Sequence, residues 1–170
     1  MRYAAIRKMD ISNGEGLGVS LFVQGCDFHC KNCFNKETWN FNGGKEFTIN
    51  EALKLLSQLW KPQYTRLSIL GGEPLHANNL ISVTMLCKFV KEFKPEKNIW
   101  VYTGFKMEDE ISLLNRDLDL FNYIDVIVDG RYIDEKKDLS YPWAGSTNQR
   151  VIDVHKSLAQ NKIVLWRSNL

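Results

Sequence analysis

The chain has 170 residues, of which 44% are apolar and 25% are charged, and its formal net charge is +2. This composition is ordinary for a globular protein, and the length suits one domain with a substantial core that spans residues 1–170. The small net charge gives no reason to expect a nucleic-acid partner, and because no run of about 18 apolar residues occurs, we expect no membrane span.

The first third of the chain predicts a strand and a helix. Residues 19–23 (VSLFV) are a short β-rich run that ends at Gly25 and Cys26, so a strand stops where a cysteine-rich loop begins. Thr48 and Glu51 form a capping box, in which Thr48 caps a helix and Glu51 reaches back. Apolar residues at helical spacing extend this helix to about residue 61, and Pro62 lies just beyond its end.

The rest of the chain alternates strands with helices. Strands are predicted at residues 66–70, 99–102, 124–128 and 163–166, and helices at residues 79–93 and 108–114. Because the connections are long enough for parallel crossovers, we expect an α/β fold whose active site lies at the C-terminal ends of parallel strands. A complete eightfold barrel needs about 250 residues, so this chain can build only part of one, and periodicity alone does not distinguish a partial barrel from an open sheet.

Three cysteines within eight residues form the most informative motif. Cys26, Cys30 and Cys33 follow the pattern Cys-x3-Cys-x2-Cys, and no fourth cysteine lies nearby. Three thiolates can hold three irons of a 4Fe–4S cube and leave the fourth iron open to a substrate or cofactor, whereas clusters that only carry electrons are closed by four cysteines. The alternative is a structural Cys3His zinc site that includes His29.

The remaining cysteine usage indicates a reducing compartment. Cys87 lies on the apolar stripe of the predicted helix at 79–93, where a free cysteine packs as a small hydrophobe. Clustered free cysteines without an export signal are typical of the cytoplasm, which is where we expect the protein.

A second motif, Gly71-Gly72-Glu73-Pro74, follows the predicted strand at 66–70. Two glycines let the backbone approach a ligand closely, and Glu73 can accept a hydrogen bond from an ammonium group. By itself the motif is equally typical of a plain strand-to-helix turn. Together with the cysteine cluster one β–α unit upstream, it favours a ligand-binding loop.

These motifs resemble the radical S-adenosylmethionine (SAM) superfamily, and more of the chain is similar to one branch, the activating proteins of anaerobic ribonucleotide reductases. The similarity covers almost the whole chain and rests on residues 13–16 (NGEG), 22–26 (FVQGC), 33–39 (CFNKETW), 71–75 (GGEPL), 102–104 (YTG), 128–130 (VDG) and 145–150 (GSTNQR). The chain departs from the branch at three positions. Glu15 replaces a usual proline, and Gly18 and Ala144 stand where arginine is common, so neither position offers an arginine for an anion contact.

The resemblance implies a laterally open, partial (β/α) barrel of parallel strands and a set of site residues. Cys26, Cys30 and Cys33 would hold a 4Fe–4S cluster, and the amino and carboxylate groups of SAM would chelate the open iron. The other implied SAM contacts are Gly71, Gly72 and Glu73 for the methionyl ammonium, Thr103, Asp129 and Arg131 for the ribose or carboxylate, and Phe34 beside the adenine.

The resemblance also implies an activity and partners. Reductive cleavage of SAM would give a 5′-deoxyadenosyl radical, which would generate a glycyl radical on an anaerobic ribonucleoside-triphosphate reductase. The electron would come from a donor such as a flavodoxin or a ferredoxin. Two alternatives stay open: a radical-SAM enzyme that acts on another glycyl-radical enzyme or a small molecule, and a non-catalytic zinc or iron–sulfur binding module.

Overall fold

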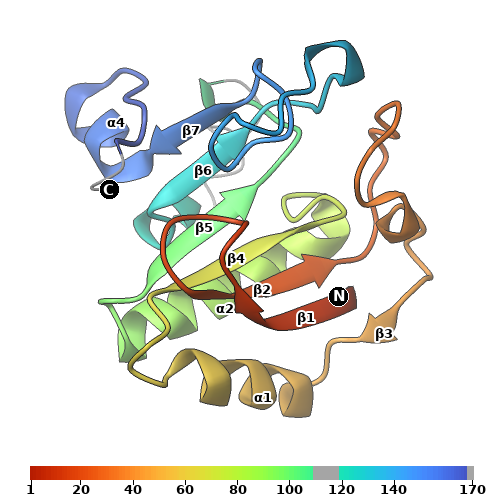
Figure 1. Cartoon of the computed structure of the whole chain (residues 1–170). Coiled ribbons are helices and arrows are strands. Elements are labelled where there is room, and N and C mark those ends of the chain that lie inside the picture. Colours follow the sequence, from red (N-terminus) through yellow and green to blue (C-terminus); the bar gives the residue numbers. More distant parts are fainter. Residues whose placement is uncertain (109–118, 168–170) are drawn as a thin grey trace.

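A mixed seven-stranded sheet organises residues 1–108 and 119–167, which are the residues that this computed structural model describes (Figure 1). The strands lie in the order β3-β1-β2-β4-β5-β6-β7. Their bounds are β1 Arg2–Asp10, β2 Gly18–Val23, β3 Lys45–Glu46, β4 Arg66–Gly71, β5 Asn98–Tyr102, β6 Val126–Asp129 and β7 Arg150–Asp153. The four neighbours β2, β4, β5 and β6 are parallel, whereas β1, β3 and β7 pair antiparallel to their neighbours. The expected parallel strands therefore form only the centre of the sheet, and its edges are antiparallel.

Helices α1 (Ile49–Leu59) and α2 (Ala77–Phe93) pack on one face of the sheet, and α4 (Val154–Gln160) follows β7 (Figure 1). Short 3-10 helices occupy Lys36–Thr38, Leu120–Asn122 and Asp134–Lys136. Thr48 caps α1 as predicted, but the Glu51 carboxylate accepts from the hydroxyl of Tyr3 at 2.9 Å and so ties the helix to β1. Helix α2 begins two residues before the predicted start because His76 Nδ1 caps it by accepting from Asn78 N.

The structure confirms some of the other strands and helices predicted from the sequence and contradicts one of them. The strands predicted at residues 19–23, 66–70 and 99–102 are confirmed, and the one predicted at 124–128 lies at Val126–Asp129. The strand predicted at 163–166 is wrong, since this segment makes only an isolated bridge between Leu165 and Ile152. The helix predicted at 108–114 lies, beyond its first residue, outside the described residues. No helix of the described ranges is long and apolar enough to cross a lipid bilayer.

The central strands bury both of their faces. Side chains of successive strand residues point to opposite faces. One face packs in the core with α1 and α2, through residues such as Leu21, Ile69 and Val101. The opposite face, called here the second face, carries the intervening residues Phe22, Leu70 and Tyr102, which form one row across β2, β4 and β5. Helices therefore occupy one side of the sheet, and the second face is left to loops.

A buried ion pair fastens the loop of residues 11–17 against the second face. Arg66 is fully buried, and its guanidinium donates to the Asp10 carbonyl at 2.8 Å and to Asp10 Oδ1 at 3.2 Å. The same carboxylate oxygen accepts from the backbone N–H groups of Ser12 and Asn13, both at 2.9 Å. A Cβ atom at Gly18 would lie 2.5 Å from the Arg66 side chain, so glycine is needed there. The path of the loop thus depends on one buried charge pair.

We expect Arg66→Met to lower the free energy of unfolding by about 3–5 kcal/mol, because it leaves the Asp10 carboxylate buried without its cation. The matched control is Lys88→Met, which breaks a half-exposed i,i+4 pair with Glu92 at 3.9 Å and should cost less than about 0.5 kcal/mol. Urea unfolding of both variants measures the difference. Equal losses in the two variants would contradict the role of the buried pair.

Candidate active site

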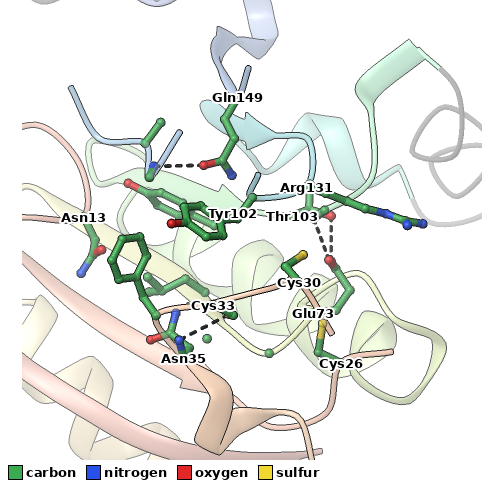
Figure 2. A pocket seen from close by; sticks show the side chains of 18 of the residues that line it. Asn13, Cys26, Cys30, Cys33, Asn35, Glu73, Tyr102, Thr103, Arg131 and Gln149 are labelled. Carbon is green, nitrogen blue, oxygen red and sulfur yellow. Dashed lines mark hydrogen bonds between the residues drawn. The ribbon is translucent and has the colours of Figure 1, made fainter. Parts of the chain in front are cut away.

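A cavity of about 510 Å³ lies on the second face, at the C-terminal ends of the parallel strands (Figure 2). This size suits a cofactor-sized ligand. Nine of the ten predicted site residues line the cavity: Cys26, Cys30, Cys33, Phe34, Gly71, Gly72, Glu73, Thr103 and Arg131. The tenth, Asp129, does not. The fold therefore brings predicted site residues that are distant in sequence together around one cavity.

The cysteine loop that follows β2 is tightly wound. His29 and Asn32 adopt left-handed backbone conformations, with φ of 45° and 54°, and Cys33 N donates to Cys30 O at 3.1 Å. The start of the loop is fixed to the segment after it, because Cys26 N donates to Trp39 O at 3.1 Å. These turns orient all three thiols toward the cavity.

The three thiols are free and only partly buried. Burial raises the pKa of Cys26 to about 11 and also raises the pKa of Cys30. Both thiols therefore stay protonated near neutral pH unless a metal cation stabilises the thiolates, so metal binding here must release protons. Cys87, by contrast, lies on α2 and is buried in the core, where burial raises its pKa to about 12.

The donor set fits a cluster better than a single metal ion. Among the described residues, no three His, Cys, Asp or Glu side chains converge closely enough to hold one ion. Zinc requires thiolates at about 2.3 Å from one point, whereas a 4Fe–4S cube spreads three cysteine ligands over three corners. His29, the fourth ligand of the zinc alternative, packs its ring against Trp39 with 4.7 Å between centroids.

The glycine loop after β4 contacts the cysteine loop backbone to backbone. Gly72 N donates to Val23 O at 2.9 Å, and Glu73 N donates to Gly25 O at 2.7 Å. A Cβ atom at Gly72 would lie 2.5 Å from Gly25 O, and Gly71 has a φ of 104°. Glycine is therefore required at 71 for its conformation and at 72 for this close approach.

Glu73 is buried, and its carboxylate braces the neighbouring strand end. Oε1 accepts from Leu75 N at 2.9 Å and from Thr103 Oγ1 at 2.7 Å, and Oε2 accepts from Gly104 N at 2.8 Å. All three donors are neutral groups. Burial consequently raises the pKa of Glu73 to about 7, although these hydrogen bonds favour its charged form. A cationic ligand group beside it would stabilise the carboxylate further.

Aromatic side chains and the Arg131 guanidinium also line the cavity. The Arg131 guanidinium stacks on Phe28, with 4.3 Å from Cζ to the ring centroid, and its charge lowers the pKa of Cys30 against the larger effect of burial. Phe34 is 52% exposed and packs against Tyr132 with 5.1 Å between ring centroids. Phe34, which follows Cys33, and Arg131, which lies after β6, therefore both line the cavity.

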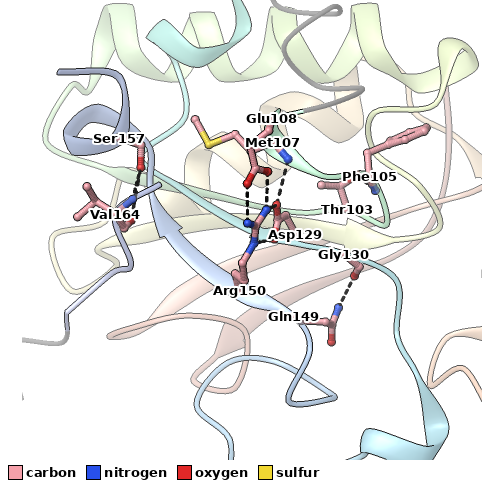
Figure 3. Close-up of polar contacts among 10 residues, drawn as sticks. All are labelled: Thr103, Phe105, Met107, Glu108, Asp129, Gly130, Gln149, Arg150, Ser157 and Val164. Carbon is pink, nitrogen blue, oxygen red and sulfur yellow. Dashed lines mark hydrogen bonds and ion pairs between the residues drawn. The ribbon is translucent and has the colours of Figure 1, made fainter. Parts of the chain in front are cut away.

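The structure places Asp129 outside the cavity and gives it other partners (Figure 3). Its carboxylate accepts from Arg150 Nε at 2.9 Å and from Met107 N at 3.0 Å, and Arg150 also pairs with Glu108 at 2.6 Å. The prediction that Asp129 contacts the cofactor directly finds no support in this arrangement. Its carboxylate instead joins β6 to β7 and to the end of the segment after β5.

Among the cavity residues that were not singled out from the sequence are Gln149, Asn13 and Tyr102. Gln149 accepts from Gly145 N at 3.0 Å and donates to Gly130 O at 2.9 Å, which holds the 145–149 segment over the end of β6. Asn13 and Tyr102 line the floor. All three lie in segments that resemble the radical-SAM branch. The motifs therefore indicated these segments of the chain but not the roles of these three residues.

Comparison with known proteins adds to this geometry. The family described as a 4Fe-4S single cluster domain matches residues 12–152. Proteins named anaerobic ribonucleoside-triphosphate reductase-activating protein are similar over most of their length. The one from Enterobacteria phage T4 is 40% identical over 89% of this chain and 93% of its own. Those from Vibrio cholerae and Escherichia coli K12 are 38% and 37% identical, over 88% and 89% of this chain and 96% and 97% of theirs.

The matched range contains the three cysteines, the glycine loop and the strand ends that surround the cavity. A family match that covers most of the chain and relatives that align along nearly their full length agree with each other. The chain therefore belongs to the family of anaerobic ribonucleoside-triphosphate reductase-activating proteins, with a 4Fe–4S single cluster domain.

Proposed function

We propose that this protein activates an anaerobic ribonucleoside-triphosphate reductase by radical-SAM chemistry. The observation that carries the proposal is the shared cavity, since three free thiols and a glycine-lined loop face the same space. Cys26, Cys30 and Cys33 would hold the 4Fe–4S cluster, and three protein ligands would leave one iron available to SAM. The relatives are named as activating proteins of this reductase, which supports the choice of substrate.

The protein residues bind and orient, while the cofactor supplies the redox chemistry. A cluster held by the three thiolates would supply one electron that breaks the bond between the SAM sulfonium and its 5′ carbon, so that methionine leaves and the deoxyadenosyl radical takes a hydrogen atom from a glycine Cα of the reductase. Gly71 and Gly72 line the cavity, where their backbone carbonyls would accept from the methionyl ammonium.

Charged residues complete the proposed SAM site. Glu73 supplies the negative charge for the ammonium, and Arg131 is suited to a carboxylate because its planar guanidinium can donate two parallel hydrogen bonds. Thr103 acts mainly by positioning Glu73, to which its hydroxyl already donates at 2.7 Å. Asp129 acts at a distance from SAM, through the ion pair that fixes the end of β6.

Two features of the structure support the proposal that the substrate is a polypeptide. The sheet ends at β3 on one side and β7 on the other, as in a single-domain, laterally open partial barrel, and the cavity rim carries exposed apolar side chains at Phe34 (52%) and Leu139 (77%). A reductase loop can enter across this rim. A small electron-transfer protein such as a flavodoxin or ferredoxin, in a reducing cytoplasm, supplies the electron.

We expect Cys30→Ala to lose the cluster and all SAM cleavage, because two thiolates cannot hold three irons of the cube. The matched control, Cys87→Ala, should keep both and lose about 1 kcal/mol of stability, since it changes only a core side chain. Iron and sulfide analysis, followed by an assay for 5′-deoxyadenosine after anaerobic reconstitution, measures this. A fully loaded and active Cys30→Ala protein would refute the ligand assignment.

Glu73→Gln should weaken SAM binding by about tenfold or more without loss of iron, since a charged hydrogen-bond acceptor is removed. Thr103→Val should weaken SAM binding less, and Thr103→Ser should stay near wild type because it keeps the hydroxyl that holds Glu73. Equilibrium binding of SAM to the reconstituted variants tests this. Unchanged SAM affinity in Glu73→Gln would remove Glu73 from the site.

A further inference from the structure

The phenol oxygen of Tyr102 is buried on the cavity floor and has no hydrogen-bond partner among the described residues. A buried hydroxyl without a partner destabilises the fold, so its retention calls for an explanation. We infer that Tyr102, with Asn13, forms a subsite that hydrogen-bonds a backbone peptide group of the reductase segment beside the reacting glycine. This inference rests on the proposed function and adds a positioning residue for its protein substrate.

The place of Tyr102 in the sheet separates it from the proposed SAM contacts. Tyr102 lies in the row with Phe22 and Leu70 on the second face. The residues assigned to SAM begin one position later, at Gly71, the last residue of β4, and at Thr103, which follows β5. A ligand that touches the row therefore lies deeper than one held by those loops. The hydrogen donor is the second reactant that the cavity must accommodate, so this deeper position suits it.

The side chain of Asn13 offers a hydrogen-bond acceptor to the same cavity. Its Nδ2 donates to Asp10 Oδ2 at 2.7 Å, and because a carboxylate only accepts, the amide nitrogen must face Asp10. The amide oxygen is then the atom left for the cavity, which Asn13 lines (Figure 2). The buried Arg66–Asp10 pair fixes this loop, so the orientation of the Asn13 amide is set before any ligand arrives.

A donor and an acceptor that line the same cavity match the chemistry of a peptide group. Burial raises the pKa of Tyr102, which keeps the phenol neutral and able to donate to a peptide carbonyl. The Asn13 oxygen can accept from a peptide N–H. Recognition through backbone groups needs no side chain on the substrate, as a glycine segment requires.

The test compares Tyr102→Phe with Tyr64→Phe in the reconstituted holoenzyme. Tyr64 is also buried, but its hydroxyl is paired with Gln58 and it lies in the core beneath the helices. Four quantities are measured: the thermal midpoint, the affinity for SAM, the affinity for the full-length reductase with SAM present, and glycyl radical formed per 5′-deoxyadenosine by electron paramagnetic resonance.

Tyr102→Phe should keep or raise its thermal midpoint, because an unpaired buried hydroxyl is removed, and should keep its SAM affinity. It should lose about fivefold to tenfold in affinity for the reductase and form less glycyl radical per 5′-deoxyadenosine. Tyr64→Phe should lower only the midpoint. Unchanged reductase affinity and radical yield in Tyr102→Phe would overturn the inference. A loss of SAM affinity alone would assign the hydroxyl to SAM, and a lowered midpoint alone would assign it to an internal water; either result also overturns the inference.

The failure of the proposed function is distinguishable from the failure of this inference. If wild-type holoenzyme forms no 5′-deoxyadenosine with reductant and SAM, the radical chemistry itself is refuted, and the peptide subsite falls with it. If wild type forms 5′-deoxyadenosine and the glycyl radical but Tyr102→Phe does so equally well, the chemistry stands and only the subsite is refuted.

Discussion

The close backbone contact between Gly25 and the loop at residues 71–73 is the constraint on which the site depends. The cysteine loop and the glycine loop leave two adjacent parallel strands, and Glu73 N donates to Gly25 O at 2.7 Å. No side chain intervenes, because a Cβ atom at Gly72 would lie 2.5 Å from the same carbonyl. The cysteine that follows Gly25 is thereby held at a fixed separation from the loop that we propose binds the SAM ammonium.

Successive strand ends are braced by side chains that reach across to them. Glu73, after β4, accepts from the residues that follow β5, and Gln149 donates to Gly130 at the end of β6. Arg150 of β7 joins Asp129 of β6. Buried charges are costly unless they are paired or hydrogen-bonded, so each brace favours one arrangement of the rim. The rim is thus preorganised, whereas the Tyr102 hydroxyl has no hydrogen-bond partner among the described residues.

The sequence predicted most of the parallel core and the cavity wall, because these depend on local signals. The glycine and cysteine motifs follow strands of strong β propensity, and Thr48 marks the start of α1. The antiparallel strands were missed for physical reasons. Strand β1 carries exposed charged residues and β7 has only four residues, so neither has a periodicity that stands out. The pairing of Asp129 with Arg150 was not foreseen for the same reason, because Arg150 lies on the unpredicted β7. The unpaired state of Tyr102 depends on packing that no local pattern encodes.

The most direct test of the central claim follows one hydrogen atom. The reconstituted protein is incubated anaerobically with SAM, reductant and a reductase whose glycines are deuterated at Cα, and the 5′-deoxyadenosine is analysed by mass spectrometry. The account predicts that deuterium appears in the 5′-deoxyadenosine as the glycyl radical signal grows on the reductase. Deuterium-free 5′-deoxyadenosine beside a radical-free reductase, or no cleavage of SAM by a fully loaded protein, would contradict it.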